Sequence, residues 1–194
     1  SSSAVIAAWM GIKIKVKNLT LSGGTAGIKI LAGGIAVLES SKIENMSEHG
    51  MYSAGAVLVC DRSNIKSIEK YGTFILDSSF GIIEKCELAG NSSSDTVRFI
   101  TSSGGEILDS TITGGKSALL IERASSVLIG KSKAVTITGA ETGITVHGSS
   151  NVEIINTTID SNSGNGIYAD RNSSVYLGGD NTITNNGGYA VELK

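Results

Sequence analysis

A pair of aliphatic residues separated by one position returns every 22 to 25 residues along this chain of 194 residues. A fixed period in this range is typical of stacked repeats, in which each repeat forms one supersecondary unit. The pairs, with two glycine-containing substitutes in the middle, are Ile12/Ile14, Ile35/Val37, Val57/Val59, Gly81/Ile83, Gly105/Ile107, Val127/Ile129, Val152/Ile154 and Val175/Leu177. Because the period is unbroken, we expect a single domain over residues 1–194.

Two further aliphatic columns have the same period. The first, which opens each repeat, is Val5, Ile28, Met51 or Tyr52, Phe74, Val97, Leu119, Ile144, Ile167 and Val191. The second, which closes each repeat, is Leu19, Ile43, Ile65, Leu88, Ile112, Val135, Ile159 and Ile183. Apolar residues alternate with polar ones within these segments, and this alternation is typical of strands that bury one face.

Three short strands per repeat, separated by Gly, Ser, Asn and Asp, indicate a coil in which each strand pairs with its counterpart one repeat later. The sequence therefore predicts an all-β, right-handed parallel β-helix with three sheets, about eight turns and no obvious caps. At the spacing of neighbouring strands, eight turns make a rod of about 38 Å. The absence of proline fits, since proline lacks the N–H that a central strand needs.

Composition excludes several classes of function. The formal net charge is −2 with both signs scattered, so no basic stripe predicts a nucleic-acid partner. The longest apolar run, residues 4–10, is too short to cross a bilayer, so no membrane span is expected. No cluster of Cys and His has metal-site spacing, and we expect neither a metal nor another cofactor.

The chain has two cysteines, Cys60 and Cys86, in consecutive repeats. Their offsets within the repeat differ by about two or three residues, so a disulfide between stacked turns would require a distorted corner. We therefore expect free thiols.

The final repeat carries the motifs Gly166-Ile167-Tyr168-Ala169, Ser173-Ser174-Val175-Tyr176-Leu177 and Asn181-Thr182-Ile183-Thr184-Asn185-Asn186. In these motifs the chain resembles the parallel β-helix repeat family of the pectate-lyase-like superfamily, which is associated with carbohydrate binding and sugar hydrolysis. The resemblance covers essentially the whole chain. It implies the fold strongly and the function weakly, since such helices include lyases, hydrolases, epimerases, phage fibres and inert surface proteins.

Glu122, His147 and Asp170 each follow the opening strand of three consecutive repeats. Stacking would place them about 5 Å apart, within reach of acid–base catalysis or a shared metal ion. Arg123 and Arg171 come next and are candidate binders of a sugar carboxylate. Charged residues are also common at solvent-exposed corners, so a purely structural role is the alternative.

Comparison with the catalytic motifs of the resembled enzymes disfavours catalysis. No cluster of aspartates like that of polygalacturonases occurs, and the Asp-Pro-His pattern of alginate epimerases is impossible without proline. Carbohydrate binding without catalysis remains open. Tyr168 and Tyr176 should point outward and are candidate sugar contacts, although they belong to different sheets.

The open ends of a solenoid offer unpaired strands, and apolar columns reach Val5 at one end and Val191 and Leu193 at the other. Copies joined through these residues would build an open filament; a trimeric fibre or a segment of a longer helix are the alternatives. We expect a structural or adhesive solenoid, extracellular or on a cell or virion surface, that contacts polysaccharide and self-associates. The alternative is a carbohydrate-active lyase, hydrolase or epimerase.

Overall fold

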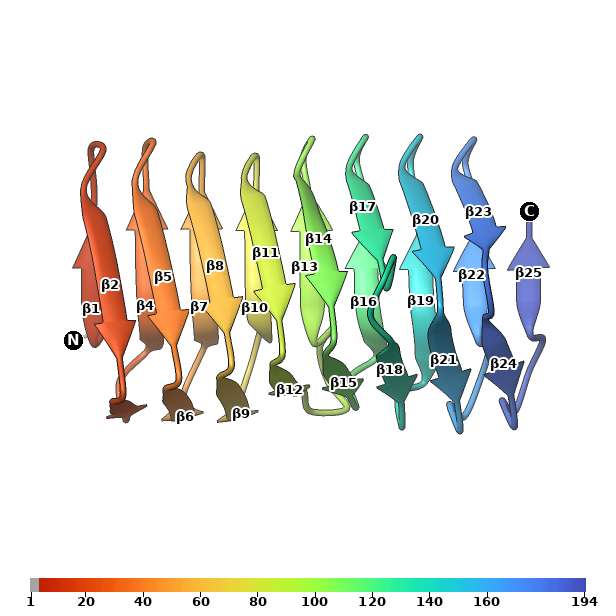
Figure 1. The fold of residues 1–194 in the computed structure, drawn as a ribbon, viewed down its shortest axis with the longest axis horizontal. Helices are drawn as coiled ribbons and strands as arrows, with labels where there is room; N and C mark the ends of the chain where they lie inside the picture. Colours follow the sequence, from red (N-terminus) through yellow and green to blue (C-terminus); the bar gives the residue numbers. More distant parts are fainter. Residues whose placement is uncertain (1–3) are drawn as a thin grey trace.

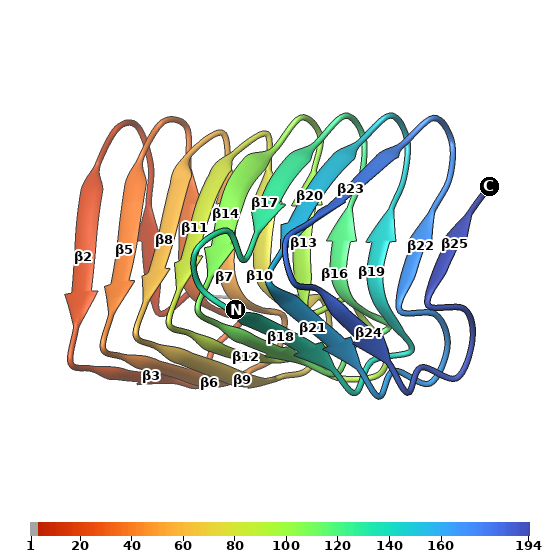
Figure 2. The same cartoon turned by 45° about the vertical axis from the view of Figure 1, so that its right-hand side comes forward.

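The computed structural model of the chain describes residues 4–194, which wind into a coil of three parallel sheets (Figures 1 and 2). Sheet A, with nine strands, contains β1 (Ile6–Ala8), β4 (Ala26–Leu31), β7 (His49–Ala54), β10 (Gly72–Asp77), β13 (Val97–Ile100), β16 (Ser117–Ile121), β19 (Thr142–Val146), β22 (Ile167–Ala169) and β25 (Val191–Leu193). Sheet B, with eight, contains β2 (Lys13–Lys17), β5 (Ile35–Glu39), β8 (Val57–Asp61), β11 (Phe80–Glu84), β14 (Gly104–Leu108), β17 (Ser126–Ile129), β20 (Asn151–Ile155) and β23 (Ser174–Gly178). Sheet C, also with eight, contains β3 (Thr20–Ser22), β6 (Lys42–Met46), β9 (Asn64–Ile68), β12 (Glu87–Ala89), β15 (Thr111–Thr113), β18 (Val135–Thr138), β21 (Thr157–Asp160) and β24 (Thr182–Thr184).

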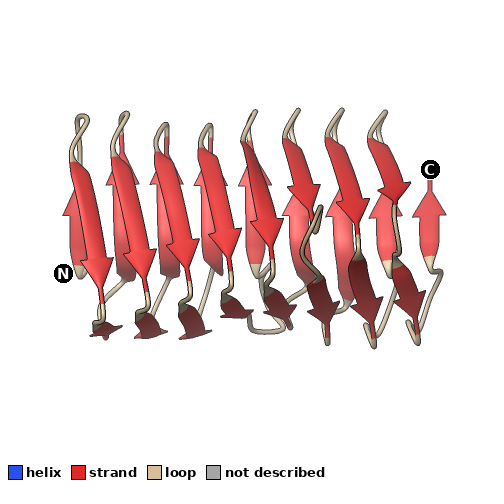
Figure 3. Cartoon of the chain, in the orientation of Figure 1, coloured by secondary structure: helices blue, strands red, loops and turns tan. Residues whose placement is uncertain are grey.

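Strands and turns make up all of residues 4–194, with no helix among them (Figure 3). The prediction of a parallel β-helix with three sheets and about eight turns is confirmed. Within this described part of the chain, no helical segment is long and apolar enough to cross a membrane.

The strand register corrects part of the predicted inward columns. In the early turns of sheet B, Ala36 and Leu38 are fully buried, whereas Ile35 and Val37 face outward and are only partly covered. The next turn repeats this, with Leu58 buried beneath outward-facing neighbours. The prediction was wrong here because both faces of these strands are aliphatic, so alternation does not tell them apart and a slip of one residue exchanges the faces.

Three column members are also displaced at other places. The register puts Ile6 and Leu21 in the inward columns in place of Val5 and Leu19, and Ile137 in place of Val135. Met51, not Tyr52, is the inward residue of β7.

Val5 precedes β1, is 43% exposed and donates its N–H to the Ala26 carbonyl, so it does not begin the column as predicted. Val191 and Leu193 lie in β25, in register with Ile167 and Ala169 of the preceding turn. Val191 is partly buried against the core and Leu193 is 67% exposed.

Glycine and phenylalanine complement each other in the middle of the core. Gly81 of β11 and Gly105 of β14 face inward, opposite the fully buried rings of Phe74 and Phe99 on sheet A. A side chain at either glycine would collide with the residues around these rings. The small residues therefore make room for Phe74 and Phe99, whereas Phe80 points outward and is 44% exposed.

Serine side chains link successive turns at the corner between sheets A and B. The backbone N–H of Ser103 donates to the Ser125 hydroxyl at 3.1 Å, and the N–H of Ser125 donates to that of Ser150 at 3.2 Å. The Ser125 hydroxyl in turn donates to the Glu122 carbonyl at 2.7 Å. Since these backbone groups are buried, the bonds satisfy donors that the sheets leave unpaired and fix the path of the chain at the corner.

Candidate functional site

Glu122, His147 and Asp170 stack at the corner where sheet A ends. Their positions follow three paired residues, Ile121, Val146 and Ala169, and the backbone N–H of His147 donates to the Ile121 carbonyl at 2.8 Å. The sequence-predicted alignment of these three residues is therefore present in the structure. We call them the corner column.

His147 and Asp170 are in direct contact within the corner column. His147 Nδ1 lies 2.5 Å from Asp170 Oδ1, and the second carboxylate oxygen accepts the hydroxyl of Tyr168 at 3.3 Å. The rings of His147 and Tyr168 meet edge to face with centroids 5.6 Å apart. This arrangement fixes the orientation of the imidazole and leaves Nε2 as the ring nitrogen that does not face Asp170.

Glu122 belongs to a different set of contacts. Its Oε1 lies 3.7 Å from Nη2 of Arg98 and 4.0 Å from Nε of Arg123. Among residues 4–194, no three His, Cys, Asp or Glu side chains are grouped so that they could hold a metal ion. The corner column is thus a histidine–aspartate pair with a glutamate on the side toward Arg98.

Arg123 and Arg171 occupy left-handed positions just after the corner, with φ of 58° and 53°. Their side chains are 69% and 77% exposed. Arg171 Nε lies 3.8 Å from Asp170 Oδ2, so each arginine neighbours the carboxylate that precedes it. Such exposed pairs are weak, and both guanidinium groups remain accessible to solvent and to a ligand.

The two candidate tyrosines lie apart, as predicted. Tyr168 is on the outer face of sheet A, in register with Thr145 and Glu192. Tyr176 is on the outer face of sheet B, opposite Glu153, and is 62% exposed. Only Tyr168 joins the corner column.

The outer face of sheet A carries a continuous row of side chains, one from each turn. The members, which are paired in register from β4 to β25, are Lys29, Tyr52, Ile75, Arg98, Leu120, Thr145, Tyr168 and Glu192. We call this row the sheet-A track. Its two tyrosines are five turns apart, or about 24 Å at the spacing of neighbouring strands.

An aromatic cluster, which sequence reasoning missed, flanks Tyr52 on the sheet-A track. The ring of His49 stacks on those of Tyr52 and Tyr71, with both centroid distances 5.1 Å. Lys29 Nζ lies 5.6 Å from the Tyr52 ring. Burial lowers the pKa of His49, which favours the neutral imidazole, and its buried Nδ1 has no hydrogen-bond partner. The period of the chain does not reveal this cluster, because the three rings come from different offsets in the repeat.

Arg98 lies in the centre of the track. Its Nε is 3.7 Å from Asp95 Oδ2, and this buried nitrogen makes no hydrogen bond. Beside it, a groove of about 330 Å³ runs over β16 and β19 and is lined by Asp95, Lys116, Ser117, Leu120, Glu122, Glu141, Thr142, Thr145, His147 and Tyr168. The groove therefore connects Arg98's neighbours with the corner column.

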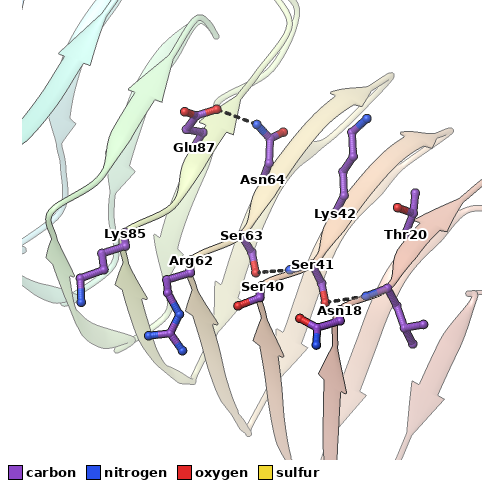
Figure 4. A pocket seen from close by; sticks show the side chains of 11 residues that line it. Asn18, Thr20, Ser40, Ser41, Lys42, Arg62, Ser63, Asn64, Lys85 and Glu87 are labelled. Atoms are coloured by element: carbon purple, nitrogen blue, oxygen red, sulfur yellow. Dashed lines mark hydrogen bonds between the residues drawn. The ribbon is translucent and has the colours of Figure 1, made fainter.

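A second, larger groove of about 730 Å³ lies at the corner between sheets B and C (Figure 4). In the figure Arg62 and Lys85 lie in one row and Asn64 and Glu87 in another, with Ser41 and Ser63 between the two rows. Arg62 Nη2 lies 2.6 Å from Asp61 Oδ2, and Asn64 donates to Glu87 at 2.7 Å. Asp61 Oδ1 and Asn64 Oδ1 are buried without a hydrogen-bond partner. No aromatic side chain is among the residues that line this groove, which makes it a weaker candidate than the sheet-A track.

Three stacked parallel sheets around an aliphatic core define a parallel β-solenoid that presents in-register rows of side chains. Residues 54–194 match the family model described as the right handed beta helix region, and the chain belongs to this family. Searches of the curated proteins and of the solved structures found no significant match.

Proposed function

We propose that the chain is an extracellular or surface-exposed structural solenoid that binds an extended polysaccharide along the sheet-A track without cleaving it. The observation that carries the proposal is the track itself: aromatic rings at Tyr52 and Tyr168 lie on either side of Arg98, in register on the outer face of sheet A. Aromatic faces pack against the apolar faces of sugar rings, and charged and amide groups bind their hydroxyls. A linear ligand suits a linear row of contacts.

Two further features support binding to this face. Buried polar groups normally have a hydrogen-bond partner, and of the four buried side-chain atoms without one among the described residues, His49 Nδ1 and Arg98 Nε lie at this face, whereas Asp61 Oδ1 and Asn64 Oδ1 lie at the corner between sheets B and C. Charges of both signs occur along the track, so hydroxyl groups are better matched to it than a uniformly charged chain.

The test is a glycan-binding screen with neutral and acidic polysaccharides, followed by titration of the best ligand against variants. Tyr52→Ala and Arg98→Ala should each weaken binding about tenfold or more, because each removes a proposed contact of about 1.4 kcal/mol or larger. Tyr176→Ala is the matched control: this tyrosine is exposed on sheet B, and its removal should leave affinity within twofold. Equal losses from Tyr52→Ala and Tyr176→Ala, or no binding to any polysaccharide, would contradict the proposal.

The second candidate is a carbohydrate-active enzyme, and the contact between His147 and Asp170 favours it. A histidine oriented by a carboxylate is a common general base. Glu122 and His147 both line the groove of about 330 Å³ over β16 and β19. Arg123 and Arg171 would then bind a substrate carboxylate. Turnover by the wild type that Glu122→Ala and Asp170→Ala both abolish would establish the enzyme in place of the binding protein.

Self-association remains part of the proposed function. Sheet B supports side-by-side contact of copies, because Ile35, Val57 and Phe80 form an outward apolar row in register, with Phe80 44% exposed. Contact through Val191 and Leu193, continuing the sheets of a second copy, is the end-to-end arrangement. Light scattering of two variants distinguishes these arrangements. Phe80→Ser should prevent side-by-side association only, and Leu193→Ser should prevent end-to-end association only.

A further inference from the structure

The two cysteines of the chain lie against each other in the core, although their offsets within the repeat differ. Cys60 Sγ and Cys86 Sγ are 2.7 Å apart, and the two residues are 0% and 1% exposed. Both are free thiols in the structure. The backbone around Cys86 keeps the regular ladder, because Glu87 N–H donates to the Ser63 carbonyl at 3.0 Å and Thr111 N–H to the Cys86 carbonyl at 2.9 Å.

Cys86 occupies a position that serine fills in the neighbouring turns. At the corner between sheets B and C, the hydroxyls of Ser63 and Ser110 each donate to the carbonyl two residues earlier, at 2.8 and 2.7 Å. Cys86 Sγ makes the same contact with the Glu84 carbonyl at 3.3 Å. Figure 4 shows two members of this row, Ser41 and Ser63, and the next turn along the corner is that of Lys85.

Cys60 is unusual in a different column. Its paired residues in the adjacent turns are Leu38 and Ile83, both fully buried, so a thiol stands where the column otherwise has a larger aliphatic side chain. The two columns are adjacent, one at the end of the sheet-B strand and the other at the corner that follows it. A spacing of 26 residues, one turn plus the step between columns, therefore brings the two sulfurs together.

We propose that Cys60 and Cys86 form a disulfide that joins the third and fourth turns when the chain folds under oxidising conditions. The sulfurs need to approach by about 0.65 Å to reach the bond length of about 2.05 Å. With glutathione disulfide as oxidant, a bond forms between the two protein sulfurs and the glutathione S–S bond breaks. The two electrons and the two thiol protons pass to glutathione, which leaves as two molecules of the thiol form.

Burial determines when this reaction takes place. Because the thiolate is the reactive form, a thiol sealed in an apolar core reacts slowly, and burial raises the pKa of Cys60 well above its usual range. The disulfide therefore forms before the core closes and afterwards resists both oxidants and reductants. Whether the disulfide is present in the folded chain therefore depends on the redox conditions during folding.

The experiment refolds the reduced, denatured chain in two buffers, one with reduced glutathione alone and one with a mixture of oxidised and reduced glutathione. Thiols are then counted in denaturant and the intact mass is measured. The reduced sample should show two thiols, and the oxidised sample none with a mass lower by two hydrogens. The oxidised sample should also melt about 10 °C higher, since the link closes a loop of 26 residues.

Cys86→Ser is the matched variant, because it restores the residue that this corner has in the turns on either side. It should fold, and its melting temperature should be the same from both buffers. Cys60→Ala provides a second variant with the same expectation. Two thiols in the oxidised wild type, glutathione adducts on both cysteines, or a disulfide only between chains would each overturn the proposal.

Discussion

The inward glycines Gly81 and Gly105 allow a sharp test of how the core is packed. Both lie at ordinary extended backbone angles, so alanine at either position introduces a methyl group without backbone strain. At Gly105 the new Cβ would lie 2.2 Å from the Gly81 carbonyl oxygen and 2.7 Å from the Phe99 ring. At Gly81 it would lie 2.4 Å from Cδ1 of Leu76, which is the end of a side chain and not a backbone atom.

The two substitutions should therefore differ in cost. Replacing glycine by alanine gains about 0.4–1 kcal/mol from the reduced entropy of the unfolded chain, and overpacking costs about 1–3 kcal/mol. For Gly81→Ala we expect a net loss near 1 kcal/mol. For Gly105→Ala, where a backbone atom must move, we expect a loss of about 3 kcal/mol or more.

The assay is urea unfolding followed by far-UV circular dichroism, with Gly104→Ala as control. Gly104 precedes Gly105 in the same strand but faces outward, and the nearest atom to a Cβ there is 3.6 Å away. Its substitution should be neutral or stabilising. Adding Leu76→Val should restore part of the stability lost in Gly81→Ala, whereas adding Phe99→Leu should leave most of the Gly105→Ala loss in place. Equal effects of the Gly104 and Gly105 substitutions would refute the packing argument.

Three further predictions concern pH and buried polar groups. Hydrogen bonds from two lysines lower the pKa of Glu39 to about 2 from an ordinary 4.5, so its contribution to stability is present above pH 4.5 and is lost as the pH falls toward 2. Glu39→Gln should flatten that part of a profile of melting temperature against pH. An unchanged profile would contradict this assignment. Burial lowers the pKa of His49, so the folded chain disfavours protonation of the imidazole and its stability should fall as the pH drops below about 6.5. His49→Gln should therefore reduce the difference in melting temperature between about pH 7.5 and about pH 5.5. Asn162→Ala should lower the free energy of unfolding in urea by about 1–3 kcal/mol, because the buried N–H of Ala140 donates to the Asn162 side chain at 3.0 Å. Asn151 is exposed, and Asn151→Ala should cost far less.

The period of the sequence was sufficient to predict the coil and the stacking of the corner column, because both depend only on which residues recur at one offset. It was insufficient for the facing of β5, where Ile35 is a stronger β-former than Ala36 and yet lies outside. The contact of Cys60 with Cys86 was missed for a related reason. It joins two different columns, and an argument that compares equal offsets cannot find it.

The aromatic cluster at one end of the track was missed because its members come from three offsets. His49 is at the start of β7, Tyr52 lies within it, and Tyr71 precedes β10. Only the path of the chain at the corner brings these rings together. The charge contacts of Arg98 likewise depend on the rotation of long side chains, which the sequence pattern does not determine.

Because each strand pairs with its counterpart in the next turn, successive residues of the sheet-A track have a fixed spacing. Side chains along it can be separated only by whole turns, so any change in the distance between Tyr52 and Tyr168 comes in steps of about 4.8 Å. Loss or duplication of one turn between them would shorten or lengthen the site by one such step and leave the contacts within each remaining turn unchanged. The proposed binding of longer or shorter ligands would therefore change by copying turns rather than by reshaping loops.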